Sequence, residues 1–113
     1  MKRSEPWRGD FVEAARSGAK VAILQVDGTA LACANWDGHL AADVPRCLGL
    51  KYEEFMDKGD VIRLRKWLAD HDESTPITYR QLMNGDKGPV MRWITIVKRW
   101  RGTAWLCFGA VRP

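Results

Sequence analysis

The chain has 113 residues, of which 46% are apolar and 28% are charged, a composition that excludes a disordered protein and predicts one globular domain. Its 18 basic and 14 acidic residues give a formal net charge of +4, which solubility explains without a nucleic-acid partner. No apolar run approaches the ~18 residues of a membrane span, and the N-terminus lacks the apolar core of a signal peptide.

The cysteines indicate a reducing compartment. Cys33, Cys47 and Cys107 are widely spaced, and no two of them form a Cys-x-x-Cys pair. This spacing is typical of small buried hydrophobic residues rather than of disulfides or a metal site. We therefore expect a cytoplasmic protein with no membrane partner.

The first predicted element is a short helix over residues 5–17. Ser4 is a suitable N-cap, and Pro6 is tolerated in the first turn because its missing N–H has no partner there. Gly18 is expected to end the helix, since glycine adopts the positive φ of a C-terminal cap.

A β-hairpin is predicted next, with strands at residues 20–26 and 29–34. Asp27-Gly28 separates the two apolar runs. This dipeptide favours a type I′ turn, in which both central residues have positive φ.

The middle of the chain predicts short helical segments followed by one longer helix. Glycines and a proline interrupt residues 35–52, and residues 51–56 could form one helical turn. The longer helix is predicted over residues 60–71 with Asp60 as its N-cap. Its apolar face consists of Val61, Leu64, Trp67 and Leu68.

The C-terminal half predicts three strands, at residues 77–83, 90–100 and 103–111. The second and third strands carry apolar residues on both faces, as Trp93 and Val97 alternate with Ile94 and Ile96. A sheet with one face in water would instead alternate polar and apolar residues. We therefore expect the middle helices to cover one face, and the N-terminal helix or a second subunit to cover the other.

This order of elements, together with several local motifs, resembles a PAS domain over residues 20–112. The motifs are Asp27-Gly28 followed by Asn35, the segment Leu48-Gly49-Leu50-Lys51-Tyr52-Glu53-Glu54-Phe55, Gly59-Asp60 with Arg63, and Gly85-Asp86-Lys87-Gly88 with Arg92-Trp93. The resemblance implies an α+β fold with a five-stranded antiparallel sheet in the order 2-1-5-4-3, which cups short helices. It divides the chain into an N-terminal helical extension, residues 1–19, and a PAS-like domain, residues 20–113.

The resemblance also implies a sensory or protein-interaction role in signal transduction. Family members bind haem, flavin, small metabolites or nothing between sheet and helices, and they commonly form homodimers through an N-terminal helix and the outer sheet face. The Asp-Ile-Thr segment that commonly ends these domains is absent from this sequence. We therefore expect signal output through a separate partner protein, unless the chain is part of a longer one.

No cofactor is assigned by the sequence. A covalent flavin adduct needs a cysteine just after the position of Gly59, where this chain has Asp60, and Cys47 lies too early. A haem would need an axial histidine near the longer helix, where only His71 is available, between Asp70 and Asp72. We therefore expect neither group, and no metal site.

An apolar cavity is the predicted binding site. Its expected lining is Leu64, Trp67, Tyr79, Trp93 and Phe108, and it would take a small apolar or aromatic ligand. The alternative is that these side chains fill the core completely. No nucleophile is paired with a base at a diagnostic spacing, so we expect a protein that is not an enzyme.

Two surfaces are predicted to bind macromolecules. A homodimer interface is expected at Phe11, Trp100, Trp105 and Val111. The alternative function is nucleic-acid binding by the basic hairpin tip Lys98-Arg99-Trp100-Arg101, assisted by Arg80, Arg92 and Arg112. A structural or assembly protein with a PAS-like fold is the third reading.

Overall fold

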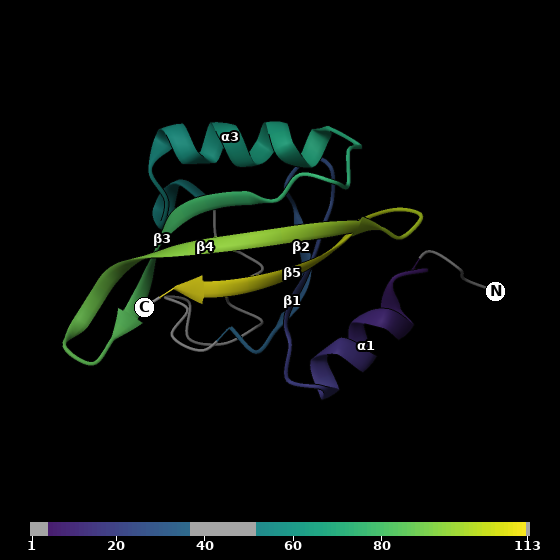
Figure 1. Cartoon of the computed structure of the whole chain (residues 1–113), viewed down its shortest axis with the longest axis horizontal. Helices are drawn as coiled ribbons and strands as arrows, with labels where there is room; N and C mark the ends of the chain where they lie inside the picture. Colours follow the sequence, from purple (N-terminus) through teal and green to yellow (C-terminus); the bar gives the residue numbers. More distant parts are fainter. Residues whose placement is uncertain (1–4, 37–51, 113) are drawn as a thin grey trace.

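A five-stranded antiparallel sheet organises the molecule, in the order β2-β1-β5-β4-β3 (Figure 1). This order confirms the sequence prediction. The structure is a computed structural model that describes residues 5–36 and 52–112, so Cys47 and the part of the predicted motifs between residues 37 and 51 lie outside the described residues. The elements are α1 (Arg8–Arg16), β1 (Lys20–Leu24), β2 (Ala30–Ala34), η1 (Tyr52–Glu54), α3 (Lys58–Ala69), β3 (Ile77–Gly85), β4 (Gly88–Trp100) and β5 (Trp105–Arg112).

The two layers of side chains on this sheet explain why its strands are apolar on both faces. On the inner face, α3 and η1 cover a core that includes Leu64, Leu68 and Ile94. On the outer face, α1 covers a second core that includes Val21 and Leu106. Figure 1 shows α3 and α1 on opposite sides of the sheet. The prediction that the middle helices and the N-terminal helix cover opposite faces is confirmed.

The turn between β1 and β2 differs from the predicted type I′ turn. Among the described residues other than glycine only Asn35 has positive φ, so Asp27 does not, whereas Gly28 has a φ of 95°. The amide of Gly28 donates to the carbonyl of Gln25 (2.9 Å), and the amide of Gln25 donates to the carbonyl of Thr29 (2.9 Å). This is a three-residue loop in which a single glycine supplies the left-handed residue. The Asp27 carboxylate accepts from the amide of Thr29 instead (2.9 Å).

Helix α1 ends at Arg16, and Gly18 supplies the left-handed residue of its C-terminal cap, as predicted. Gly18 has a φ of 87°, and its amide donates to the carbonyl of Ala15, while the amide of Ala19 donates to that of Ala14. This pair of bonds is a Schellman cap. Asn35, with a φ of 66°, adds two further bonds, donating from Nδ2 to the carbonyls of Ala15 (2.9 Å) and Ala19 (2.8 Å). The start of α1 differs from the prediction, because Pro6 lies in the turn before the helix and Ser4 lies outside the described residues.

Helix α3 begins at Lys58, and the prediction of Asp60 as its N-cap is wrong. Asp57 is the N-cap, and its carboxylate accepts from the amide of Gly59 (3.2 Å). Asp60 instead pairs with Arg63 (2.9 Å) and accepts from the amide of Arg80 on β3 (3.1 Å). Asp60 therefore connects α3 to the edge of the sheet.

The β3–β4 hairpin is longer than predicted. The two strands pair without interruption from Ile77 with Ile96 to Gly85 with Gly88. Residues 86 and 87 therefore form the whole turn, and the glycines that suggested a longer loop belong to the ladder. Midway along the hairpin the hydroxyls of Thr78 and Thr95 share a hydrogen bond (2.8 Å).

Candidate functional site: a cavity between the sheet and α3

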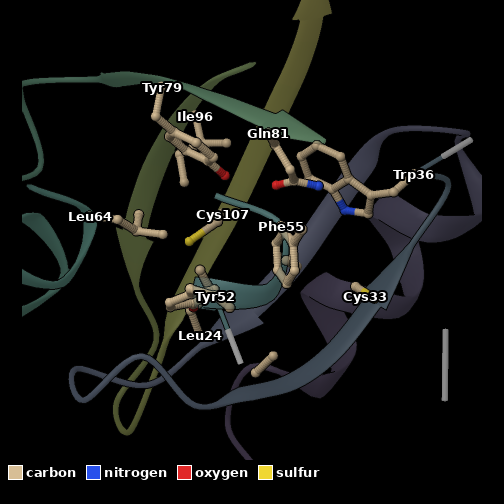
Figure 2. A pocket seen from close by; sticks show the side chains of 12 residues that line it. Leu24, Cys33, Trp36, Tyr52, Phe55, Leu64, Tyr79, Gln81, Ile96 and Cys107 are labelled. Carbon is tan, nitrogen blue, oxygen red and sulfur yellow. The ribbon is translucent and has the colours of Figure 1, made fainter. Parts of the chain in front are cut away.

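A cavity of about 80 Å³ lies on the inner face of the sheet. All five strands, α3 and η1 contribute side chains to its wall (Figure 2). The lining residues are Ala22, Leu24, Ala30, Cys33, Trp36, Tyr52, Phe55, Leu64, Tyr79, Gln81, Ile96 and Cys107.

Hydrogen bonds to the backbone hold η1 against the strands and so position one wall. The Tyr52 hydroxyl donates to the carbonyl of Gly28 in the first hairpin (2.6 Å). The amide of Leu82, on the edge strand β3, donates to the carbonyl of Phe55 (2.8 Å). The rings of Tyr52 and Phe55 meet edge to face, with their centroids 6.1 Å apart. This wall is therefore attached to both ends of the sheet.

Trp36 forms the opposite wall and depends on a glycine. Its indole Nε1 donates to the carbonyl of Val21 (3.0 Å). A Cβ on Gly109 of β5 would overlap the six-membered ring of Trp36, so the indole can lie flat on this strand only where a side chain is missing.

Three titratable groups of the wall, a thiol and two phenols, are neutral near pH 7. Burial raises the pKa of the Cys107 thiol to about 12. Burial also raises the pKa of the phenols of Tyr52 and Tyr79 well above their ordinary value. Among the described residues that line the cavity there is no Lys, Arg, Asp, Glu or His. The cavity therefore presents apolar surface with a few uncharged polar atoms.

Gln81 is the unusual member of this wall. It is only 4% exposed, and its amide Nε2 has no hydrogen-bond partner among the described residues. Figure 2 shows the amide between Trp36 and Phe55, with Tyr79 on the same side of the cavity. A buried amide nitrogen without a partner is costly in free energy, so this group requires a reason.

Of the five predicted cavity residues, the structure brings Leu64 and Tyr79 into the wall and not Trp67, Trp93 or Phe108. Residues that pair directly across strands point to the same face, and Tyr79 pairs with Ile94. Trp93 pairs with Arg80, and Phe108 pairs with Val97. Both rings therefore lie on the outer face, where Phe108 packs near α1 and Trp93 is 46% exposed.

Trp67 lies elsewhere on the inner face, in an aromatic cluster at the C-terminal end of α3. We call Trp67, His71, Trp100 and Trp105 the aromatic cluster. The His71 ring lies 4.9 Å from that of Trp100 and 5.2 Å from that of Trp105, between ring centres. The indole Nε1 of Trp67 donates to the carbonyl of Thr75 (2.7 Å), and that of Trp105 donates to Leu68 (2.8 Å).

The aromatic cluster changes the predicted interface. Trp105 is 0% exposed and Trp100 is half-buried, so neither presents a surface on the outer face. Val111 pairs with Ile94 and packs against the inner core. Phe11, a half-buried residue of α1 itself, is the only one of the four predicted interface residues on the outer side, and it is in edge-to-face contact with Trp7.

The predicted basic hairpin tip is largely occupied within the molecule. Lys98 is 1% exposed, and Arg101 is paired with Asp10 of α1 (2.5 Å). Arg99 donates to the carbonyl of Lys98 (2.9 Å). With Trp100 inside the aromatic cluster, this tip has no free stacking ring, whereas Arg80 lies over the exposed Trp93 ring (5.5 Å).

Sequence reasoning missed most of the cavity wall, including Trp36, Tyr52, Phe55 and both buried thiols. The sequence pattern of β3 could have identified Gln81 as a site residue. Ile77, Tyr79 and Met83 are buried at every second position of β3, and Gln81 occupies the remaining position on that same face. A polar residue at a core-facing position is an indication of a site.

The described residues provide neither a metal site nor a membrane-spanning helix. Within residues 5–36 and 52–112 no group of three metal-ligating side chains is close enough to hold an ion. His71 lies outside the cavity wall. None of the described helices is long and apolar enough to cross a membrane.

The chain has a PAS-like fold. Among solved structures it is similar to the PAS domain of an HTR-like protein from Haloarcula marismortui, with a TM-score of 0.60 and 17% sequence identity over 93% of this chain and 92% of that one. No protein-family model matches the sequence, and no curated protein is detectably similar to it. At this identity the similarity establishes the architecture alone.

Proposed function

We propose that the chain is a PAS-like sensory or protein-interaction module that binds a small apolar or aromatic molecule in the cavity. The observation that carries this proposal is an apolar cavity whose buried Gln81 amide nitrogen has no partner among the described residues. The wall holds the neutral thiol of Cys107 and the neutral phenols of Tyr52 and Tyr79, which favours binding over catalysis. The thiols of Cys33 and Cys107 are both buried, which suits a reducing cytoplasm.

Native mass spectrometry of protein purified from cells tests the proposal, compared with a variant whose cavity is filled. Ala30→Leu places a larger side chain in the wall, and Ala110→Leu makes the same change at an exposed position of β5. We expect a retained mass in the wild type and in Ala110→Leu, and none in Ala30→Leu. If all three proteins retain the same mass, the ligand lies elsewhere, and if none does and no added small molecule binds, the proposal fails.

A homodimer through the outer face is the second part of the proposal. Met91 and Trp93 are 42% and 46% exposed on the outer-facing side of β4, beyond the area that α1 covers. Large exposed apolar side chains at one place favour a protein partner, and a second copy would bring the same patch to the contact.

Analytical ultracentrifugation tests this part. Trp93→Glu should shift a wild-type dimer to monomer, whereas Ile62→Glu, a change at a 55% exposed residue of α3, should not. A wild type that stays monomeric at high micromolar concentration would exclude the homodimer.

A further inference from the structure

We propose that the cavity selects a neutral molecule of roughly six non-hydrogen atoms whose hydrogen-bond acceptor, such as a carbonyl oxygen, meets Nε2 of Gln81. This inference rests on the proposed function and adds the chemistry of the ligand. It follows from three properties of the described wall, namely the buried Gln81 amide nitrogen without a partner, the lack of charged side chains and the volume.

The donor defines the polar contact. An amide nitrogen carries two N–H groups and no lone pair available for bonding, so it can be satisfied only by an acceptor. The β3–β4 pairing fixes Gln81 opposite Arg92, and its neighbours of the same parity, Tyr79 and Met83, are buried with it. The side chain therefore remains inside the wall, and a ligand acceptor is the partner that the cavity can offer.

The lack of charge excludes ionic ligands. The described wall, formed by residues within 22–36 and 52–107, contains no cationic side chain, and the raised pKa of the Cys107 thiol keeps that group neutral at physiological pH. Moving a carboxylate or a phosphate into such a wall would remove its hydration without providing a counter-charge. The same reasoning applies to ammonium groups, because these described lining residues include no carboxylate.

The volume limits the size. A water molecule needs about 10–15 Å³ of comparable space, and a cavity of about 150 Å³ holds one benzene ring. The 80 Å³ present here is below the range of about 300–1,000 Å³ that holds drug-sized ligands. Counted in waters, it holds about six non-hydrogen atoms, and it is smaller than the cavity that holds benzene, so a five-membered ring or a short branched chain is the largest ligand that it suits. It is too small for a porphyrin or an isoalloxazine.

Three five-membered rings of similar size separate these properties. Cyclopentanone has an acceptor, pyrrole has a donor, and cyclopentane has neither. Their dissociation constants can be measured by NMR titration, with the indole N–H of Trp36 as a reporter because it bonds to Val21 at the cavity wall. The test compares the wild type with Gln81→Met, which keeps the length of the side chain and removes its amide.

We expect Gln81→Met to weaken the binding of cyclopentanone at least tenfold relative to that of cyclopentane, since a ligand that satisfies a buried donor gains about this factor in affinity. The dissociation constant of pyrrole should not rise. Gln25→Met makes the same change in the β1–β2 turn, outside the wall, and should alter none of the three constants. Gln81→Leu serves as a second apolar variant if Gln81→Met does not fold.

The outcomes distinguish this inference from the proposed function. If all three rings bind and Gln81→Met changes them equally, the cavity is a binding site but the acceptor rule is wrong. If Gln81→Met weakens the binding of pyrrole more than that of the other two rings, Gln81 presents its amide oxygen to the ligand, and the acceptor rule is again wrong. If no ring binds the wild type, the ligand-binding function itself fails.

Discussion

The ammonium of Lys98 lies 4.1 Å from the centre of the Trp105 ring, in the interior of the protein. A second indole, Trp67, lies 4.5 Å away, and Nζ also donates to the main-chain carbonyls of Trp67 and Asp70. These carbonyls are at the C-terminal end of α3, where a cation is favourable because the last carbonyls of a helix lack partners. One residue of β4 therefore fixes the end of the helix that covers the sheet.

Replacing Lys98 tests how much this contact stabilises the fold. Lys98→Met roughly keeps the length of the side chain but removes its ammonium group. The carbonyls of Trp67 and Asp70, at the end of α3, then lose their hydrogen-bond donor. We expect the free energy of unfolding to fall by about 1–3 kcal/mol, measured by urea denaturation. Lys87→Met, at the exposed β3–β4 turn, should change it by less than about 0.5 kcal/mol. A Lys98→Met protein as stable as the wild type would show that dehydration of the ammonium cancels its contacts.

Lys98 also illustrates a limit of prediction from the sequence, because its burial could not be inferred from its local context. In the run Lys98-Arg99-Trp100-Arg101 it has the appearance of an exposed cation, yet it has the parity of Ile94 and Ile96 and so faces the core. Parity was available in the sequence, but the identity of the inner face was not, because it depends on which helix packs there. The strand order and the two-sided core were predictable, since they follow from local motifs and apolar pattern.

The same limit explains the cavity. Leu64 and Tyr79 were identified because each belongs to a clear apolar face of its own element. Trp93 was misplaced because its size suggested a core position, although its cross-strand neighbour Arg80 shares its face. Trp36 gave no periodic signal at all, because it follows the end of β2 and its position depends on Gly109, far away in the sequence.

Asn35 supplies a second prediction, because it combines a left-handed backbone with two hydrogen bonds to the end of α1. Asn35→Gly keeps the backbone conformation and loses only the bonds, which should cost about 2 kcal/mol. Asn35→Ala loses the bonds and also strains the backbone, which should add about 1 kcal/mol. Urea denaturation of both variants measures the two parts. An alanine variant more stable than the glycine variant would contradict this account.

Gly109 is the basis of a third prediction. Gly109→Ala should displace the Trp36 ring and break its bond to Val21, which we expect to cost about 1–3 kcal/mol and to shift the indole N–H signal of Trp36. Gly9, in the first turn of α1, has open space around its Cα, so Gly9→Ala should stabilise the protein by about 0.5 kcal/mol. An unchanged Trp36 signal in Gly109→Ala would show that the ring does not depend on this glycine.

The pH dependence of stability should reveal the buried thiol of Cys107. Burial raises the pKa of this thiol from 9.0 to about 12, so between these values the unfolded chain loses a proton that the folded protein keeps. Stability from this group is therefore fully present below pH 9 and is lost as the pH rises, by up to about 1.4 kcal/mol per unit.

Lys98 acts in the opposite direction, because burial lowers its pKa and the folded protein then releases that proton first. The Cys107→Ala variant keeps the burial of Lys98, Tyr52 and Tyr79, which is the largest cause of each of their shifted pKa values, so a comparison with the wild type removes most of their contributions. We expect the difference in free energy of unfolding between the two proteins to be constant from pH 7 to 8.5 and to shift against the wild type from pH 9 to 10.5. A difference that stays constant to pH 10.5 would mean that the thiol ionises in the folded protein as readily as in the unfolded chain, and that the inner face around Cys107 is open to water.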